Sequence, residues 1–258
     1  MCGATQGIGR ACAFEFARLG ARVTLLARNE EGLRRVRDEI AAAAGAQAGS
    51  GAPRHDFLRA DFAEPDSVRA VVARHVERAG PVEILLNNTG GPPAGPIVEA
   101  DPEAFLAGFS AHLICNQVLA QTLLPGMKAA AYGRIINIIS TSVKQPIRGL
   151  GVSNTIRGAV ASWAKTLAGE LAPFGITVNN VLPGATATER LRSLIQSKAR
   201  AAGISDDEIE RQLKSEIPMG RFAGPEEIAA AAGFLATPAA GYITGISLPV
   251  DGGRTSCL

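Results

Sequence analysis

Apolar stretches long enough for a β-strand alternate along this chain with stretches that have the period of an α-helix. Strand-like runs occupy residues 23–27, 82–86, 134–139 and 176–181, and helical patterns occupy residues 30–44, 102–130 and 150–172. Because these strands are apolar on both faces, helices must cover both sides of the sheet that they form. The pattern therefore predicts an α/β fold with a doubly wound parallel sheet, a Rossmann-like three-layer sandwich. No internal repeat or composition shift marks a second domain, so we expect residues 1–258 to form one domain.

The charge balance and the aromatic content limit the partners of the protein. Its 26 basic and 24 acidic side chains give a formal charge of +2, and only 5% of its residues are aromatic. A nucleic-acid binder needs a strongly basic surface or closely spaced exposed rings for base stacking. We therefore expect no nucleic-acid partner.

The cysteines and the uncharged stretches indicate where the protein works. Cys2, Cys12, Cys115 and Cys257 fit neither zinc-binding spacing nor a disulfide framework, so we expect no metal and a reducing compartment, the cytoplasm. Residues 104–127 and 228–250 lack charges, but polar residues, glycines and prolines interrupt them, so we expect buried soluble segments and no membrane partner. No secretory signal is expected. Residues 45–53 are expected to form a surface loop.

A glycine-rich turn stands near the start of the chain. The apolar-periodic helix over residues 11–19 is preceded by Gly3-Ala4-Thr5-Gln6-Gly7-Ile8-Gly9. At a helix N-terminus, backbone N–H groups and the positive end of the helix dipole can bind a pyrophosphate. The turn is therefore a candidate cofactor site, although glycine turns also cap many helices that bind no ligand.

The residues after the first predicted strand bear on which cofactor is bound. The strand over residues 23–27 ends in Arg28 and Asn29, with no acidic residue. NAD-binding folds place Asp or Glu here to bind the ribose 2′-hydroxyl, whereas an arginine suits the 2′-phosphate of NADP. We therefore favour NADP over NAD as the cofactor. A solvated arginine at a strand end is the plain alternative.

The spacing GxxxGxG and further motifs along most of the chain resemble the short-chain dehydrogenase/reductase family. Asp61-Phe62 is similar to that family's adenine-contacting acid and its neighbour, Asn87-Asn88-Thr89-Gly90 to its NNAG turn, Pro183-Gly184 with Thr186 and Thr188 to the turn that faces the nicotinamide, and residues 245–253 to its closing strand. The resemblance implies that the cofactor contacts Gly3, Thr5, Gln6, Gly7, Ile8, Gly9, Arg28, Asp61, Phe62, Asn88, Gly90, Arg157, Pro183, Gly184, Thr186 and Thr188.

The strand that should precede the glycine-rich turn is missing, because only Met1 and Cys2 stand before Gly3. In the family resembled, this strand lies in the middle of the sheet, and each of its buried apolar side chains would contribute roughly 1.5–3 kcal/mol. Their sum rivals the roughly 5–15 kcal/mol stability of a whole domain. We therefore hypothesise that the start of the chain is misplaced or truncated; equal thermal stability and cofactor affinity in a longer version would contradict this.

Members of the family usually reduce a carbonyl by hydride transfer, using a tyrosine, a lysine, a serine and an asparagine. Ser140 matches the serine that binds the carbonyl oxygen; a strand-terminal serine bonded to local backbone is the plain alternative. The family's spacing then places Ser153 at the tyrosine position, Arg157 at the lysine position and His112 at the asparagine position. With three of four positions changed, the family's usual proton transfer is not expected in its standard form.

The substituted groups differ in what they can do chemically. A serine hydroxyl is far less acidic than a phenol, so Ser153 alone is a poor proton donor. Arg157 keeps its charge, can bind ribose or phosphate oxygens and can stabilise an oxyanion, but it does not shuttle protons near neutral pH. His112 can donate a proton if its ring reaches the pocket. A satisfied histidine on a packed helix is the favoured alternative.

Two further segments sharpen the resemblance. Gly90-Gly91-Pro92-Pro93 and Ser153-Asn154-Thr155-Ile156-Arg157 are similar to an atypical subgroup that resembles 3-oxoacyl-carrier-protein reductases but has a degenerate catalytic tetrad. Residues 187–218 are expected to form a substrate lid, whose mixed charges do not identify a ligand. The resemblance also implies a homo-oligomer, a dimer or a tetramer, that assembles through the helices over residues 102–130 and 150–172.

Three functions remain open at this point. The first is an NADP-dependent oxidoreductase that acts on a small-molecule carbonyl or secondary alcohol through an atypical proton donor. The second is a nucleotide-binding but catalytically silent member that acts as a sensor or oligomer partner, which the combined loss of Tyr, Lys and Asn supports. The third is a truncated relic that binds nothing. Cofactor turnover against a panel of ketones and alcohols distinguishes the first two.

Overall fold

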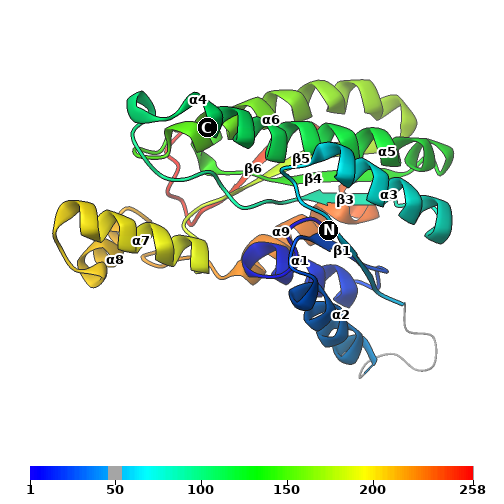
Figure 1. Cartoon of the computed structure of the whole chain (residues 1–258), viewed down its shortest axis with the longest axis horizontal. Helices are drawn as coiled ribbons and strands as arrows, with labels where there is room; N and C mark the ends of the chain where they lie inside the picture. The colour runs from blue at the N-terminus through cyan, green and yellow to red at the C-terminus, as the bar shows by residue number, and fades with distance from the viewer. Residues whose placement is uncertain (46–53, 258) are drawn as a thin grey trace.

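A parallel sheet forms the centre of the computed structural model, which describes residues 1–45 and 54–257 (Figure 1). All pairings between its strands are parallel. One part of the sheet pairs β1 (Thr24–Ala27) with β2 (Asp56–Arg59), and the other has the order β3 (Ile84–Asn87), β4 (Gly133–Ile138), β5 (Ile176–Pro183) and β6 (Ser247–Val250). The predicted α/β fold with a parallel sheet is confirmed.

The first three residues join the two parts of the sheet. The Cys2 N–H donates to Leu86 O of β3 at 3.0 Å, and the Gly3 N–H donates to Leu26 O of β1 at 2.9 Å. Cys2 forms a single parallel bridge with Leu26. Met1 to Gly3 therefore occupy the central place of the sheet, although no strand precedes α1 in the described residues. The hypothesis about the start of the chain stays a prediction.

Helices cover both faces of the sheet, as the two-sided apolar strands require (Figure 1). One face is covered by α1 (Gly7–Arg18), α2 (Glu30–Gly45) and α9 (Pro225–Ala236), and the other by α3 (Pro65–Ala79), α5 (Cys115–Ala129) and α6 (Gly151–Leu171), with α4 (Pro102–Phe109) beside α6. Alternate strand residues enter separate cores. Leu25 and Ile136 pack with α1 and α9, whereas Leu26 and Ile135 pack on the opposite side.

The helix predicted over residues 102–130 is not one regular helix. A π-helical segment, Ser110–Ile114, lies between α4 and α5 and contains His112. Such a bulge inserts an extra residue into a turn, which changes the face on which the following side chains lie, and it is common at functional sites. Periodicity alone did not reveal it. The uncharged stretch 104–127 maps onto these three elements.

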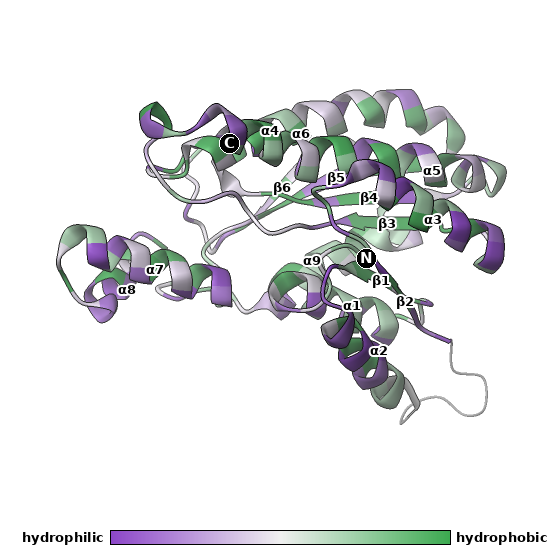
Figure 2. Ribbon diagram, in the orientation of Figure 1, coloured by the Kyte–Doolittle hydropathy of each residue, from purple (hydrophilic) through white to green (hydrophobic). Residues whose placement is uncertain are grey.

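The expected lid region, residues 187–218, contains the helices α7 (Glu189–Ala202) and α8 (Asp206–Ser215). In Figure 1 this helix pair projects away from the sheet and its covering helices. The pair has a small apolar cluster of its own, centred on Ile195, Ala199 and Ile209. Hydrophilic and hydrophobic residues alternate along both helices (Figure 2). The helices α7 and α8 therefore pack mainly against each other and less against the main core.

A ladder of buried amides crosses the larger part of the sheet. Asn87 Nδ2 donates to Asn137 Oδ1 at 2.9 Å, Asn137 Nδ2 donates to Asn180 Oδ1 at 2.9 Å, and Asn180 Nδ2 donates to Ser247 Oγ at 3.2 Å. These four residues are direct partners in the register of β3, β4, β5 and β6. Because a one-residue slip would break every link of the ladder, it specifies the register of all four strands.

The remaining elements are short. They are the 3₁₀ turns η1 (Ile97–Glu99), η3 (Thr141–Val143), η4 (Ala172–Phe174) and η5 (Pro238–Ala240). No helix in the described residues is long and apolar enough to cross a membrane. Residues 228–250 form most of α9, then η5 and β6. The expectation of a buried segment holds for much of α9 but not for residues 241–250, none of which is buried. Of the loop expected over residues 45–53, Gly45 ends α2, and residues 46–53 lie outside the described part.

Candidate functional site

A cleft of about 1230 Å³ opens at the carboxyl ends of the strands. In an open parallel α/β sheet, ligands bind at this edge, outside the carboxyl ends of the strands. The cleft runs from the glycine-rich turn, past the ends of β4 and β5, to the inner side of α7. Its walls include most of the expected site residues: Gly3, Thr5, Gln6, Gly7, Ile8, Arg28, Asp61, Phe62, Asn88, Gly90, Ser140, Ser153, Arg157, Pro183, Gly184, Thr186 and Thr188.

The glycines of the turn allow close backbone packing. A Cβ on Gly9 would lie 2.1 Å from Gly3 O, and a Cβ on Gly3 would lie 2.5 Å from Asn88 O. Gly3 and Gly7 also have positive φ angles of 59° and 52°. Any larger residue at Gly3 or Gly9 would push the turn away from Asn88. Gly9 does not line the cleft and acts in this packing instead.

The N-terminus of α1 opens into the cleft without a protein cap. The N-cap residue is Gln6, and within residues 1–45 and 54–257 no side-chain cap hydrogen bond is made to the first N–H groups of the helix. Free N–H groups at a helix N-terminus, next to a backbone turn that a Cβ would fill, are the groups that a pyrophosphate requires. The turn thus fits the diphosphate of a dinucleotide.

Arg28 and Asp61 lie together at one end of the cleft. Arg28 Nη1 is 3.8 Å from Asp61 Oδ2, and the Arg28 side chain is 76% exposed. Asp61 Oδ1 accepts from the Ala63 N–H at 2.9 Å, which leaves the carboxylate fixed against its own turn. So long and exposed an ion pair is weak, so the Arg28 guanidinium is available to an incoming phosphate.

The turn after β5 faces the glycine-rich turn across the cleft. Thr186 Oγ1 donates to Gly184 O at 3.1 Å, and Thr188 Oγ1 donates to Thr186 O at 3.2 Å. Thr188 is the N-cap of α7, where its hydroxyl accepts from the Leu191 N–H. A Cβ on Gly7 would lie 3.3 Å from Thr188 Cγ2, so the two turns are in close reach.

Ser140 and Ser153 both line the cleft, from different elements. Ser140 follows β4, and its Oγ accepts from the Ser142 N–H at 3.1 Å as the N-cap of η3. That bond leaves its proton free to donate. Ser153 stands in the first turn of α6, where it is half-buried. The local bonding expected of a strand-terminal serine and exposure to the cleft are therefore both present at Ser140.

Arg157 extends from α6 toward the end of β4 and is 8% exposed. Its Nη1 donates to Ile138 O at 3.1 Å, whereas its buried Nε has no partner in the described residues. Burial first, and then the charge of Arg190, lower the pKa of Arg157 to about 10. The guanidinium stays charged at neutral pH, next to the position of Ser140.

His112 lies behind the wall of the cleft. Its ring is 3% exposed, and Nδ1 is 2.5 Å from Thr89 Oγ1. Thr89 lines the cleft and His112 does not. Burial, followed by the charge of Arg157, lowers the pKa of His112 to about 3. The imidazole is thus neutral at neutral pH, and it contacts the wall of the cleft at the Thr89 hydroxyl and the Gly90 backbone.

One residue of the cleft was not assigned a role from the sequence. Arg190, in the first turn of α7, lines the cleft, and its Nη2 donates to Pro92 O at 2.6 Å. In the sequence Arg190 is one of several charges in a mixed segment. The signal that singles it out is its position two residues after Thr188, which only the fold turns into proximity to the Gly91-Pro92 loop.

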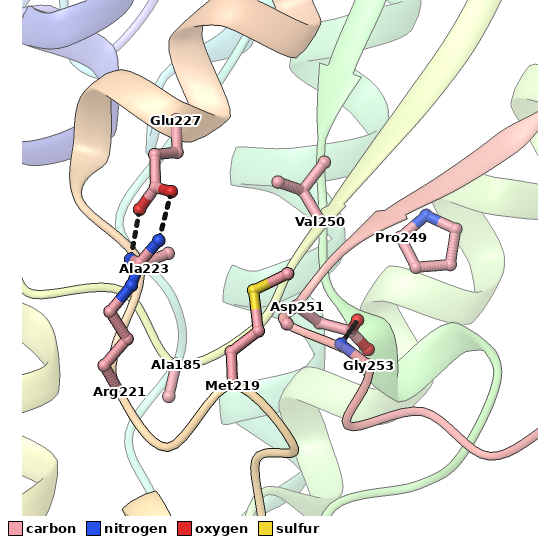
Figure 3. Close-up of a pocket in the computed structure, with 10 residues that line it drawn as sticks. Ala185, Met219, Arg221, Ala223, Glu227, Pro249, Val250, Asp251 and Gly253 are labelled. Atoms are coloured by element: carbon pink, nitrogen blue, oxygen red, sulfur yellow. Dashed lines mark hydrogen bonds and ion pairs between the residues drawn. The ribbon is translucent and has the colours of Figure 1, made fainter.

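A smaller pocket of about 300 Å³ lies behind the Pro183-Gly184 turn (Figure 3). Arg221 and Glu227 face each other there through two hydrogen bonds of 2.7 Å, so their charges neutralise each other. The Asp251 carboxylate accepts from the Gly253 N–H at 3.0 Å and braces the end of β6. This pocket supports the turn and offers no unpaired group for chemistry. Across the described residues, no three His, Cys, Asp or Glu side chains gather in a metal-binding arrangement.

The parallel sheet, the glycine turn and the uncapped helix end define a dinucleotide-binding α/β protein. A family model described as Enoyl-(Acyl carrier protein) reductase matches residues 3–255. The chain therefore belongs to the short-chain dehydrogenase/reductase family, and it is an oxidoreductase of that family.

Individual relatives agree with this assignment. The 2,3-dihydroxy-2,3-dihydro-p-cumate dehydrogenase of Pseudomonas putida is 33% identical over 256 residues, covering 98% of this chain and 92% of that protein. The L-sorbose reductase of Gluconobacter frateurii, solved with NADPH and L-sorbose, is similar with a TM-score of 0.91 at 30% identity, covering 100% of this chain and 96% of its own. A variant of actinorhodin polyketide ketoreductase, solved with NADPH, has a TM-score of 0.89 at 32% identity, covering 99% of this chain and 96% of its own.

Proposed function

We propose that this protein is an NADP(H)-dependent oxidoreductase that interconverts a carbonyl and a secondary alcohol, with an atypical route for the proton. The observation that carries the proposal is one cleft that contains both the glycine turn with Arg28 and the pair Ser140 and Arg157. The relatives solved with NADPH support the choice of cofactor. When bound, the cofactor supplies or accepts the hydride.

The residues of this chain divide the remaining work. The N-terminus of α1 binds the diphosphate and Arg28 binds the 2′-phosphate, which favours NADP over NAD. The Ser140 hydroxyl donates a hydrogen bond to the carbonyl oxygen of the substrate and keeps its proton. Arg157 stabilises the negative charge that develops on that oxygen, because its buried guanidinium is charged and has no carboxylate partner among the described residues.

The proton itself comes from solvent in the open cleft in this proposal. Ser153 is too weak an acid, and Arg157 keeps its protons at neutral pH. His112 serves as a positioning residue, because its neutral ring holds the Thr89 hydroxyl at the wall of the cleft. A solvent proton therefore takes the place of the family's tyrosine proton.

The first test is a titration of the purified protein with NADPH and with NADH, followed by nicotinamide fluorescence. We expect tighter binding of NADPH and a selective loss in Arg28→Ala, by about tenfold or more, since charge-assisted hydrogen bonds contribute about 1.5–3 kcal/mol. Arg34→Ala is the matched control, because Arg34 is an exposed arginine paired with Glu30 on the next helix. Failure to bind NADPH would refute the proposal.

Turnover against ketones and alcohols is the second test. We expect Ser140→Ala to lower the reductase rate by about 10²–10³, as the loss of an oxyanion donor does, with NADPH affinity unchanged. A second function stays open on one observation, that three of the four family catalytic positions are changed. Tight NADPH binding without turnover of any carbonyl would favour a silent sensor or oligomer partner.

We also propose a cytoplasmic location and a homo-oligomer, a dimer or a tetramer. The first rests on the four cysteines, which are all unpaired in the described residues. The second rests on the family, whose resemblance implies assembly through the helices over residues 102–130 and 150–172.

A further inference from the structure

Arg157 is a buried cation without a partner of opposite charge. In the described part of the chain no carboxylate lies within 4 Å of its guanidinium, and its buried Nε makes no hydrogen bond. Burial of an unpaired charge is costly, and folded proteins usually avoid it by placing a counter-ion beside it. Because Arg157 is buried at the wall of a cleft, an anionic ligand that enters the cleft would supply the missing counter-ion.

Arg190 reinforces the same end of the cleft. It is exposed above Gly91, with its guanidinium 3.5 Å from the place of a Cβ on that glycine. It forms no ion pair among the described residues, and one of its Nη groups is held by Pro92 O. Its charge acts on Arg157, whose pKa it helps to lower. The two positive guanidinium groups repel each other, and an anion bound between them would remove this repulsion.

The acidic side chains that line the cleft do not pair with Arg157 or Arg190. Asp61 and Glu189 are the two acids among the lining residues, against the five cations Arg28, Arg157, Arg190, Lys198 and Arg254. Asp61 pairs with Arg28 at one end of the cleft, Glu189 pairs with Arg192, and Arg254 pairs with Glu216 outside the lining. Lys198 lies about two turns further along α7. Arg157 and Arg190 thus both line the cleft and form no ion pair among the described residues.

The cofactor does not neutralise them in the proposed function. Its diphosphate belongs to the N-terminus of α1 and its 2′-phosphate to Arg28. The resemblance assigns the position of Arg157 to ribose hydroxyls, which carry no charge. The remaining anion must come from the substrate.

We propose that the substrate is an oxo acid, a carbonyl compound whose carboxylate binds to Arg157 and Arg190 while its carbonyl oxygen meets Ser140. The inference rests on the proposed function. Guanidinium groups bind planar carboxylates through paired N–H donors, and each arginine here keeps free N–H groups after its single backbone bond. In the reverse direction the same site takes a hydroxy acid.

The test compares charged ligands with neutral ones of the same shape. Acetoacetate and acetoacetamide, and 2-oxobutanoate and its methyl ester, are titrated into the complex with NADP⁺ by calorimetry at low salt. We expect each acid to bind about tenfold or more tightly than its neutral partner, the range of a charge-assisted hydrogen bond. Dihydroxyacetone phosphate is measured beside dihydroxyacetone, and a stronger preference for that phosphate than for the carboxylates would overturn the assignment.

The variants separate substrate binding from cofactor binding. In Arg190→Gln we expect the preference for acids to fall by about threefold or more, while Arg157 retains the rest of it, with the NADPH dissociation constant changed by less than about threefold. Arg192→Gln, two residues away, exposed and paired with Glu189, is the matched control and keeps the preference. An acid preference in Arg190→Gln as large as in the unmodified protein, or equal binding of acids and neutral analogues by the unmodified protein, would overturn the inference.

The two proposals fail in different ways. No NADPH binding by the unmodified protein would remove the proposed function. Tight NADPH binding, with turnover of neutral ketones and no preference for acids, would remove only the inference about the substrate.

Discussion

At the scale of single residues, the structure separates the catalytic candidates that the sequence grouped together. Ser140, Ser153 and Arg157 share the cleft, whereas His112 lies behind Thr89. The sequence placed all four through the spacing of the family that it resembles, since they lie on three separate segments of the chain. It could not show that His112 is sealed from the cleft, because that depends on the π-helical segment around it.

The neutral state of His112 predicts how stability depends on pH. The fold lowers its pKa from 6.5 to about 3, so the unfolded chain takes up a proton below pH 6.5 that the folded chain does not. Stability is therefore complete above pH 6.5 and is lost as the pH falls toward 3, by up to about 1.4 kcal/mol per pH unit. His55 and His75, whose pKa values burial also lowers, add to this loss.

His112→Asn should make this loss shallower. We expect the free energy of unfolding, measured with urea, to fall less steeply between pH 6.5 and pH 5 in the variant than in the original protein. Measurements at pH 8 supply the baseline, since the imidazole is neutral there in both states. Parallel pH dependences of the two proteins would contradict the buried neutral histidine.

At the scale of elements, the ladder of amides specifies how four strands are aligned, which no single strand can do. The sequence shows asparagines within apolar runs and nothing more, because their pairing depends on the register of four strands far apart in the chain. Short β2 and its neighbour α3 were not singled out either; the side chains of β2 are at most half-buried, so its pattern is weak.

Asn137→Ala removes the middle of the ladder. Asn137 is 0% exposed, and its loss leaves the amide of Asn87 and the carbonyl oxygen of Asn180 without their partners. Each unsatisfied buried group costs about 1–3 kcal/mol, so we expect a loss of about 2–5 kcal/mol in the free energy of unfolding. Thermal and urea unfolding measure it.

A neighbouring substitution serves as the control for this prediction. Ile135→Val, on the same strand and equally buried, shortens an apolar side chain and should cost only about 0.5–1.5 kcal/mol. A loss in Asn137→Ala no larger than in Ile135→Val would show that the ladder does not stabilise the sheet.

The helix pair α7–α8 offers a second prediction at this scale. Ile209→Ala empties the apolar cluster that joins the two helices, while the main cores stay intact. We expect the KM for the carbonyl substrate to rise by about tenfold, with a thermal midpoint nearly unchanged, because low-stability elements unfold locally. An unchanged KM would argue against a lid, the role that residues 187–218 are expected to have.

At the scale of the whole molecule, the fold class and the cofactor half followed from the sequence because alternating periods and glycine spacing are local signals. The residues on the substrate side of the cleft could not be predicted in the same way. The charge of Arg190 acts on Arg157 because α7 lies against the loop after β3, a placement that no local pattern encodes. Fold-level contacts of this kind need the structure.

The oligomeric state is the prediction that belongs to this scale. We expect light scattering to give a mass of two or four times 26.7 kDa. Gly158→Glu, on α6, should shift the protein to monomers, because nothing in the described chain lies within 4 Å of a Cβ there. Arg35→Glu, on exposed α2, is the control and should leave the mass unchanged. A monomer before any substitution would refute the assembly through these helices.

The ladder of amides also has a direction. Every amide in it donates toward the next strand in the order β3, β4, β5 and β6, and the first carbonyl oxygen, Asn87 Oδ1, is left without a donor. The side-chain dipoles therefore align head to tail across the width of the sheet and polarise one another. One amide cannot rotate by itself without placing two donors or two acceptors face to face. The three amides therefore reverse their orientations together or not at all. A substitution at Ser247 would thus alter the hydrogen bonding of Asn87, three strands away.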